Sequence, residues 1–404
     1  MREVAIVSPL RTAVGRFGGS LKDIPAADLG ATVAKAILER TGLDPARVDD
    51  VVLGHGYPGG EEPAIGRIVG LKAGLPVETP GYQLDRRCAS GLQAILNAAM
   101  LVQTDNADVV LAGGVESMSR VEFYTSPDIR WGVRQGGIEL KDRLDRSRTC
   151  AAPEEIVGYI SGMIETAENV AKKYDISREA QDEYAVRSHQ RAVAAQQEGR
   201  FAGEIVPVTI PQRRGDPIVF AEDEGPRADT TPEALARLRP MMGPDGSVTA
   251  GNASSQNDAA SLCLVVAADK LDELGLEPSL YLRGWASAGV HPAYMGIGPV
   301  PAFEKLSAKT GVGLADIDVV ELNEAFASQV LGVLQGWGVA DDRDFLEKLN
   351  PNGSGISLGH PIAATGARIL ATMSPELQRR SARYGLETMC VGGGQGLAAL
   401  FERP

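Results

Sequence analysis

The chain runs Tyr82-Gln-Leu-Asp-Arg-Arg-Cys88-Ala-Ser-Gly-Leu-Gln-Ala-Ile-Leu-Asn-Ala-Ala-Met100 where a predicted strand turns into a predicted helix. Residues 82–84 have the character of a strand end, and from Ala89 the apolar residues recur at helical spacing. Cys88 therefore lies at a helix N-terminus, where free backbone N–H groups and the helix dipole stabilise negative charge. We expect this thiol to ionise more easily than a free one, which would make it a nucleophile. A buried cysteine that only packs against a core helix is the competing interpretation.

The segments on either side alternate between strand and helix patterns. We predict strands at 4–7, 51–53 and 108–112, the last closed by Gly113-Gly114, and helices at 27–38 and 64–74. A small-residue run at 259–268 predicts a helix followed by a strand that completes the first unit. Alternation of this kind favours an α/β fold with a largely parallel sheet.

The C-terminal part of the chain repeats the N-terminal part. Gly311-Val-Gly-Leu-Ala-Asp-Ile-Asp-Val-Val-Glu-Leu322 mirrors Gly42-Leu-Asp-Pro-Ala-Arg-Val-Asp-Asp-Val-Val-Leu53. At the same offset, the Cys88 turn corresponds to the region of His360, and the strand before Gly113-Gly114 corresponds to 389–394. An internal repeat predicts two related α/β units packed back to back. Ligands of such sheets bind at strand ends, where equivalent turns of the two units meet.

Composition excludes several classes of protein. The formal net charge of −13 argues against nucleic acid as a main partner, because phosphate backbones require clustered Lys and Arg. No apolar run is long enough to span a membrane, and the first ten residues lack the pattern of a secretory signal. The four cysteines are scattered, which excludes zinc ribbons and redox CxxC motifs and fits a reducing cytoplasm.

The character of the sequence changes between 121 and 246. This stretch is rich in charges, Pro and Gly, and contains two predicted helices, at 163–174 and at 177–198, where Ser177 begins an incomplete capping box. The helices have apolar faces that must be covered. We therefore predict an insertion in the first α/β unit rather than a free linker, and insertions of this kind often carry ligand contacts.

Three further motifs place polar side chains at turns that follow strands. They are Glu321-Leu-Asn323-Glu324-Ala-Phe326, the glycine-rich approach to Gly359-His360-Pro361, and Cys390-Val-Gly392-Gly-Gly394. Each has a structural alternative: Asn-Glu can cap a helix, a histidine before proline can be structural, and Cys390 can be core packing. Their joint occurrence in a duplicated fold favours a shared site.

Together, Cys88-Ala-Ser-Gly, Asn323-Glu-Ala-Phe, Gly359-His360-Pro and Cys390-Val-Gly-Gly-Gly resemble the thiolase family in order and spacing, and the resemblance covers essentially the whole chain. It implies a duplicated α/β fold with two back-to-back mixed sheets in a layered α-β-α-β-α arrangement. It also implies three regions. Residues 1–120 with 247–275 form the N-terminal half, 121–246 a CoA-binding loop domain, and 276–404 the C-terminal half.

The resemblance also implies roles for the site residues. Cys88 would be the nucleophile, His360 would accept its proton, and Cys390 would act as acid and base. One oxyanion hole would consist of His360 and a water held by Asn323. The other would consist of the backbone N–H groups of Cys88 and Gly392, and glycine would suit position 392 for this reason.

Coenzyme A or acyl-CoA would be the substrate, with no tightly bound cofactor and no metal site. The positions that match the family's CoA contacts are Met163, Arg227, Ala250, Ser254, Ala325 and Phe326. A surface charge remains an alternative for Arg227, and core packing remains one for Phe326. Thiolases are dimers or tetramers, so the resemblance implies a homodimer or homotetramer, here in the cytoplasm.

The implied activity is reversible acyl transfer by a ping-pong mechanism through an acyl-Cys88 intermediate. It would cleave a 3-ketoacyl-CoA or condense two acyl-CoA molecules, as an acetyl-CoA C-acetyltransferase or C-acyltransferase. The alternatives are a β-ketoacyl synthase-like or hydroxymethylglutaryl-CoA synthase-like condensing enzyme, against which Asn323 and Cys390 argue, and a CoA-binding protein without turnover.

The sequence departs from the family pattern at four positions near these motifs. Asp85 stands where Asn is usual, and Gly is usual at the positions of Ile164, Ser255 and Ala363. None of these changes removes a catalytic group. Ile164 and Ser255 are expected to narrow the substrate pocket or to displace the CoA tail.

Overall fold

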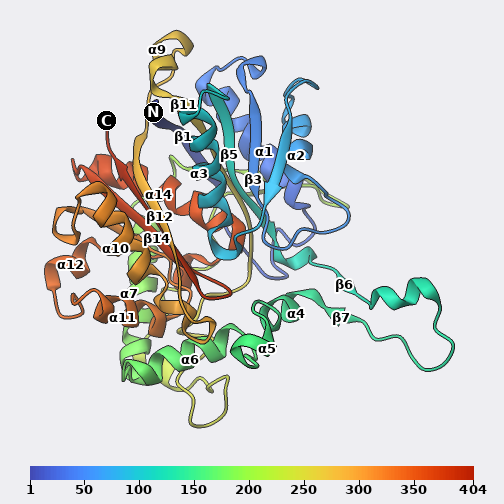
Figure 1. The fold of residues 1–404 in the computed structure, drawn as a ribbon, viewed down its shortest axis with the longest axis vertical. Helices are drawn as coiled ribbons and strands as arrows, with labels where there is room; N and C mark the ends of the chain where they lie inside the picture. The colour runs from blue at the N-terminus through green and yellow to red at the C-terminus, as the bar shows by residue number, and fades with distance from the viewer.

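The computed structural model describes all 404 residues and contains two related halves (Figure 1). The strands of the N-terminal half lie in the order β1 (Val4–Thr12), β11 (Asn257–Ala267), β5 (Val109–Ser117), β3 (Asp50–Gly54) and β4 (Gly81–Leu84). Those of the C-terminal half lie in the order β12 (Leu280–Gly289), β15 (Gln395–Glu402), β14 (Tyr384–Val391) and β13 (Val319–Leu322). The halves meet where β1 pairs with β12 at Ala5–Tyr281 and Ile6–Leu280.

Both halves are mixed in strand direction. Strand β3 is parallel to β4 and β5, and β13 is parallel to β14, whereas β11 and β15 are antiparallel to their neighbours. A largely parallel sheet was therefore the wrong expectation, because β11 and β15 each return beside an existing strand. The mixed sheets expected from the family resemblance are confirmed.

Helices form three layers around and between the two halves of the sheet. Helices α1 (Ala26–Thr41) and α2 (Ile65–Ala73) cover the outer face of the N-terminal half, and α10 (Pro299–Thr310) and α11 (Ala327–Gly336) cover that of the C-terminal half. Helices α3 (Ser90–Gln103) and α14 (Thr365–Arg379) contact each other and strands of both halves, so they form the middle layer. This is the predicted α-β-α-β-α arrangement.

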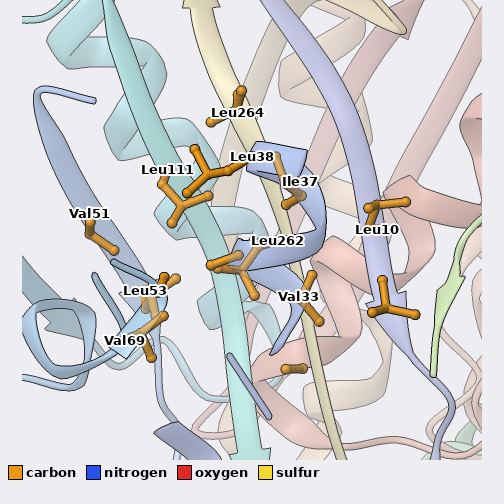
Figure 2. Close-up of a cluster of buried hydrophobic side chains, with 14 of the residues drawn as sticks. Leu10, Val33, Ile37, Leu38, Val51, Leu53, Val69, Leu111, Leu262 and Leu264 are labelled. Atoms are coloured by element: carbon orange, nitrogen blue, oxygen red, sulfur yellow. The ribbon is translucent and has the colours of Figure 1, made fainter. Parts of the chain in front are cut away.

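Each interface between layers has its own apolar core. The first core joins α1 and α2 to the N-terminal sheet, and Figure 2 shows its side chains, among them Val33, Leu53 and Leu262. The second joins α3 and α14 to both halves, and the third joins α10 and α11 to the C-terminal sheet. The burial of these apolar faces is the main stabilising contribution to the layered fold.

The predicted repeat is visible in equivalent contacts. Asp49 Oδ2 accepts hydrogen bonds from the backbone N–H groups that begin β5, at 2.7 and 3.0 Å, and Asp318 Oδ2 does the same at the start of β14, at 2.8 Å in both bonds. Gly42 and Gly311 end α1 and α10 with φ of 65° and 73°. The equivalent of β4 is reduced to a single parallel bridge, between Val320 and Leu349.

Three predicted elements have different extents. Strand β5 does not end at Gly113-Gly114 but continues to Ser117, because a Cβ at Gly114 would lie 1.9 Å from the Ala363 carbonyl oxygen and glycine permits this close approach. Residues 259–267 contain no helix, since β11 is extended throughout and buried on both faces. Strand β1 continues past Val7 to Thr12 through a bulge.

The predicted insertion contains helices and short strands. Its helices are α4 (Arg143–Thr149), α5 (Glu154–Val157), α6 (Met163–Lys173), α7 (Arg178–Gln197) and α8 (Pro232–Ala236). Ser177 caps α7 by accepting from the Ala180 N–H at 3.1 Å, as predicted. Its strands are β6 (Phe123–Tyr124), β7 (Lys141–Asp142), β8 (Ile205–Val206), β9 (Val208–Ile210) and β10 (Ile218–Phe220).

Residues 121–142, with β6 and β7 at their base, form an arm that extends away from the layered body (Figure 1). The remaining short strands and α-helices are β2 (Gly15–Arg16), α9 (Leu271–Leu274), α12 (Arg343–Lys348) and α13 (Gly355–Leu358). No helix in the structure is long and apolar enough to cross a membrane.

Candidate active site

Cys88 and His360 line one pocket of about 270 Å³. Cys88 lies in a single turn of 3-10 helix, Arg87–Ala89, between β4 and α3, and His360 follows α13. These are the equivalent turns of the two halves, so the pocket forms where the repeat predicted it. The other lining residues are Met118, Asp145, Arg148, Ser161, Gly162, Met163, Ile164, Glu165, Met241, Met242, Ala253, Ser254, Ser255, Gln256, Met295, Ala325, Phe326 and Ile362.

The turn that carries Cys88 is held by its neighbours. Asp85 Oδ1 accepts from the Arg87 N–H at 2.7 Å, and the Ser90 hydroxyl accepts from the Arg86 N–H at 2.8 Å. Arg87 has a positive φ of 46°, which is uncommon for a residue with a side chain. The hydrogen bonds therefore hold the backbone in a strained conformation that directs Cys88 into the pocket.

The thiol of Cys88 does not ionise easily in this pocket. Burial raises its pKa to about 11, although the backbone N–H groups of Gly392 and of Cys88 itself act in the opposite direction. The expectation from the helix N-terminus alone was therefore wrong, because desolvation of the thiolate outweighs the stabilising dipoles. Cys88 is therefore a thiol at neutral pH, and an attack by its sulfur would require a base.

His360 has the properties of that base. Burial lowers its pKa to about 3, so the imidazole is neutral at physiological pH. Its Nδ1 lies 2.7 Å from Thr365 Oγ1, a hydroxyl that can accept from Nδ1–H or donate to Nδ1. Nε2 is buried without a hydrogen-bond partner, and in the tautomer protonated at Nδ1 it is free to accept a proton.

The backbone of His360 is fixed by Asn257, at the start of β11. The Oδ1 atom of Asn257 accepts from the His360 N–H at 2.9 Å. Gly359 has a φ of 101°, and a Cβ there would lie 2.6 Å from the Asn257 side chain. Glycine is required at 359 for both reasons, and the histidine is thereby anchored to the N-terminal half.

Asn323 follows β13 and is completely buried beside the imidazole. Its Nδ2 lies 3.5 Å from His360 Nδ1, and its Oδ1 has no hydrogen-bond partner. A buried unpaired oxygen of this kind commonly binds a water molecule. The side chain predicted to hold a water therefore has an unused acceptor beside the imidazole.

Cys390 lies near the end of β14, next to Cys88. It is completely buried in an apolar cluster with Met295, Ala325 and Phe326. Burial, and then the proximity of Cys88, raise the pKa of its thiol well above the ordinary range. The two sulfurs from opposite halves of the repeat are thus brought together, although Cys390 lies behind the pocket wall.

The backbone N–H of Gly392 faces Cys88. The space at position 392 would also admit a side chain. A Cβ there would meet nothing closer than Arg87 Cγ at 3.7 Å, which is an ordinary contact. The residues that require glycine are Gly393 and Gly394, with φ of 86° and 85°. The predicted part of Gly392 in an oxyanion hole concerns the space beside a substrate and stays a prediction.

Four of the six predicted CoA contacts line the pocket, namely Met163, Ser254, Ala325 and Phe326. The Ser254 N–H donates to the Ala325 carbonyl at 2.9 Å, which joins the two segments. Arg227 and Ala250 are exposed and lie outside the pocket lining. Of the unusual residues, Ile164 and Ser255 line it, whereas Ala363 donates its N–H to Glu116 at 3.1 Å.

Sequence reasoning missed the residues that hold the site together. Glu324 was considered as a helix cap, but its carboxylate instead accepts from Tyr184 Oη at 2.9 Å, Ser188 Oγ at 2.6 Å and Asn350 Nδ2 at 3.0 Å. It therefore ties the loop after β13 to α7. Glu324 stood within a motif that drew attention, whereas Thr365 and Asn257 carried no signal of their own. No group of His, Cys, Asp or Glu side chains is arranged to hold a metal ion.

Comparison with known proteins identifies relatives over the full length. The family model described as thiolase, N-terminal domain, matches residues 4–269, and that described as thiolase, C-terminal domain, matches residues 276–403. An acetyl-CoA acetyltransferase of Chromobacterium violaceum is 48% identical over 404 residues, with 100% of both chains covered.

Two solved structures share the fold of the whole chain. The acetyl-CoA acetyltransferase of Bacillus anthracis has a TM-score of 0.94 at 43% identity, covering 100% of this chain and 99% of that one. Human mitochondrial 3-ketoacyl-CoA thiolase in complex with CoA has a TM-score of 0.92 at 38% identity, covering 100% and 98%.

Proposed function

The chain belongs to the thiolase family, and we propose that its acyl transfer proceeds through Cys88, His360 and Cys390 as a reversible ping-pong reaction. The protein is an acyltransferase of the thiolase type. The observation that supports these residue roles best is that a buried thiol and a buried neutral imidazole, whose Nε2 has no partner, line the same pocket. Such a pair transfers its proton only when a substrate arrives.

In the first half-reaction, the Cys88 sulfur attacks the thioester carbonyl while His360 Nε2 takes its proton. Negative charge develops on the carbonyl oxygen, and the N–H groups of Cys88 and Gly392 stabilise it. The carbon–sulfur bond to CoA then breaks, and the Cys390 thiol gives its proton to the leaving sulfur. Cys88 is left as a thioester and Cys390 as a thiolate.

In the condensing second half-reaction, the Cys390 thiolate removes a proton from the methyl group of a second acetyl-CoA. The resulting carbanion attacks the acyl carbon on Cys88, and the Cys88 sulfur leaves and recovers its proton from His360. A water held by the free Oδ1 of Asn323, together with His360, stabilises the enolate oxygen. In the thiolytic direction, Cys390 deprotonates free CoA instead.

The substrate enters through the pocket formed with residues 121–246, which we assign as the CoA-binding loop domain between the N-terminal half (1–120 with 247–275) and the C-terminal half (276–404). Apolar lining by Met163, Ala325 and Phe326 suits the pantetheine chain. Arg227 and Ala250 remain proposed contacts for the nucleotide end of CoA, since that end lies outside a pocket of this size. No tightly bound cofactor takes part.

We also propose that the protein is a homodimer or homotetramer and is located in the cytoplasm. The arm at 121–142 exposes Phe123, Trp131 and Leu140, and Trp131 is 87% exposed. Apolar side chains gathered on one projecting segment favour association with another copy. All four cysteines are free, which is consistent with a reducing compartment.

The test is covalent labelling of Cys88. Incubation with acetyl-CoA is expected to release free CoA and to add one acetyl group to the peptide that contains Cys88, as measured by mass spectrometry. Cys88→Ala serves as the matched control, and acyl exchange in this variant at the wild-type rate is incompatible with the proposal.

A further inference from the structure

The catalytic pocket contains an arginine that the reaction does not use. Arg148, on α4, lines the pocket together with Cys88 and His360, and its side chain is half-buried. Neighbouring arginines are neutralised, Arg143 by Glu122 and Arg87 by Asp85, whereas no carboxylate pairs with Arg148. A guanidinium inside a substrate pocket without a counter-ion is available to an anionic ligand.

Neutral groups hold this guanidinium in place. The carboxamide oxygen of Gln256, oriented to satisfy both side chains, accepts from Arg148 Nη2 at 2.7 Å and from Nη1 at 3.1 Å. The Tyr57 hydroxyl also lies beside Arg148. Neutral groups therefore hold the Arg148 guanidinium in place, and no carboxylate offsets its positive charge.

The two carboxylates of the pocket lining do not take this role. Glu165 is already occupied, because its Oε2 accepts from the Ser161 N–H at 2.7 Å and from the Ser161 hydroxyl at 2.6 Å. Asp145 is exposed to solvent at the rim. Neither forms an ion pair with Arg148.

Two neighbours of Arg148 connect it to the residues around His360. Its neighbour Tyr57 packs with Met118 and Ile362, which line the pocket beside His360. Gln256 directly precedes Asn257, the residue that fixes the His360 backbone. Arg148 therefore shares the wall of the pocket that contains Cys88 and His360.

We propose that Arg148, positioned by Gln256, is a specificity-determining residue that binds a carboxylate at the far end of the acyl chain. The preferred substrate is then a 3-ketoacyl-CoA with a terminal carboxylate. This inference rests on the proposed function, since it concerns the same pocket and the same acyl-Cys88 chemistry. The five methionines of the lining, Met118, Met163, Met241, Met242 and Met295, adapt to the rest of the chain.

The test compares two thioesters that differ only in this group, 3-oxoadipyl-CoA and 3-oxohexanoyl-CoA, in thiolysis with free CoA. The wild-type protein is expected to favour the carboxylate by at least about tenfold in kcat/KM, as a charge-assisted hydrogen bond provides. Arg148→Gln should lower this ratio by about 10- to 100-fold, and Arg148→Lys should restore part of it. Arg146→Gln, on the same helix but outside the pocket, is the matched control and should keep the wild-type ratio.

Gln256→Glu provides a second variant, since its carboxylate would pair with Arg148 and lower the ratio while the arginine remains. Wild-type preference for 3-oxohexanoyl-CoA, or an unchanged ratio in Arg148→Gln, overturns the inference and leaves the thiolase chemistry intact. An equal rise in KM for both thioesters in Arg148→Gln assigns the arginine to the CoA portion and also overturns it. Failure of wild type to cleave either thioester or to acylate Cys88 overturns the proposed function itself.

Discussion

Thr365 Oγ1 lies 2.7 Å from His360 Nδ1, and a hydrogen bond accepted from Nδ1–H would leave Nε2 unprotonated. Thr365→Val should therefore lower kcat/KM about 10- to 100-fold, because the ring loses the partner that fixes its tautomer. Thr365→Ser retains the hydroxyl and should recover most of the activity. Equal loss in both variants would show that the methyl packing, rather than the hydrogen bond, matters.

The raised pKa of Cys88 predicts a distinctive pH dependence of its alkylation. Only the thiolate reacts, so with a pKa of about 11 the rate with iodoacetamide should rise about tenfold per pH unit between about pH 7.5 and 9.5. The measurement is best made in a Cys150→Ser background, since Cys150 is exposed and would react as well. A plateau near pH 8 would indicate a thiolate stabilised by the helix N-terminus after all.

Separation of the two half-reactions is expected from Cys390→Ser. Cys88 and His360 remain, so one equivalent of CoA should still be released, more slowly because the Cys390 proton donor is lost, and acetyl-Cys88 should accumulate. Steady-state condensation should fall by at least about 100-fold, because a hydroxyl is a much weaker acid than a thiol and forms no alkoxide at neutral pH to remove the methyl proton. Mass spectrometry of the trapped enzyme checks this result. A variant that turns over normally would remove Cys390 from the mechanism.

The turn before His360 should not tolerate a side chain. Gly359→Ala introduces a Cβ 2.6 Å from Asn257 at a φ of 101°, and we expect a loss of stability of about 1–3 kcal/mol together with most of the activity. Gly203→Ala is the matched control, since Gly203 has ordinary φ and no neighbour within 4 Å of a Cβ. Thermal unfolding of the two variants, followed by circular dichroism, provides the comparison.

If the arm at 121–142 joins two copies of the protein, the oligomer should depend on the exposed side chains of Trp131 and Leu140. Trp131→Ser combined with Leu140→Ser removes large apolar groups that are 87% and 67% exposed, and should reduce the oligomer mass measured by light scattering. Val77→Ser alters a residue that is 71% exposed elsewhere on the surface and should leave the mass unchanged. An identical mass for all three proteins would place the contact between copies on another surface.

Much of the site could be predicted because its residues follow strands in a repeated pattern. Cys88, Asn323, His360 and Cys390 all come from turns or strand ends that the duplication brings to one place. The repeat predicted two related units packed back to back, and the resemblance to the thiolase family implied the layered arrangement. These predictions depended on local features of the sequence. The features are the change to helical spacing of the apolar residues after Cys88 and the glycine-rich turns.

The rest depends on distances that the sequence does not contain. The pKa of Cys88 is set by the desolvation that closely packed neighbours impose, and this outweighs the helix terminus. Asn257 contacts His360 across 103 positions of sequence, and nothing in its immediate surroundings announces that contact. The first part of strand β11 was predicted as a helix, because a strand buried on both faces loses its alternation and resembles a buried helix.

Packing of α3 against α14 gives each half an apolar surface that only the other half can cover. A single unit made on its own would have to associate with an identical unit in order to fold, in a symmetric pair with two equal turns facing each other. Fusion of two such units into one polypeptide removes the constraint of equality. One turn can then carry a cysteine and the equivalent turn a histidine. A duplicated fold can in this way supply two different groups to one reaction.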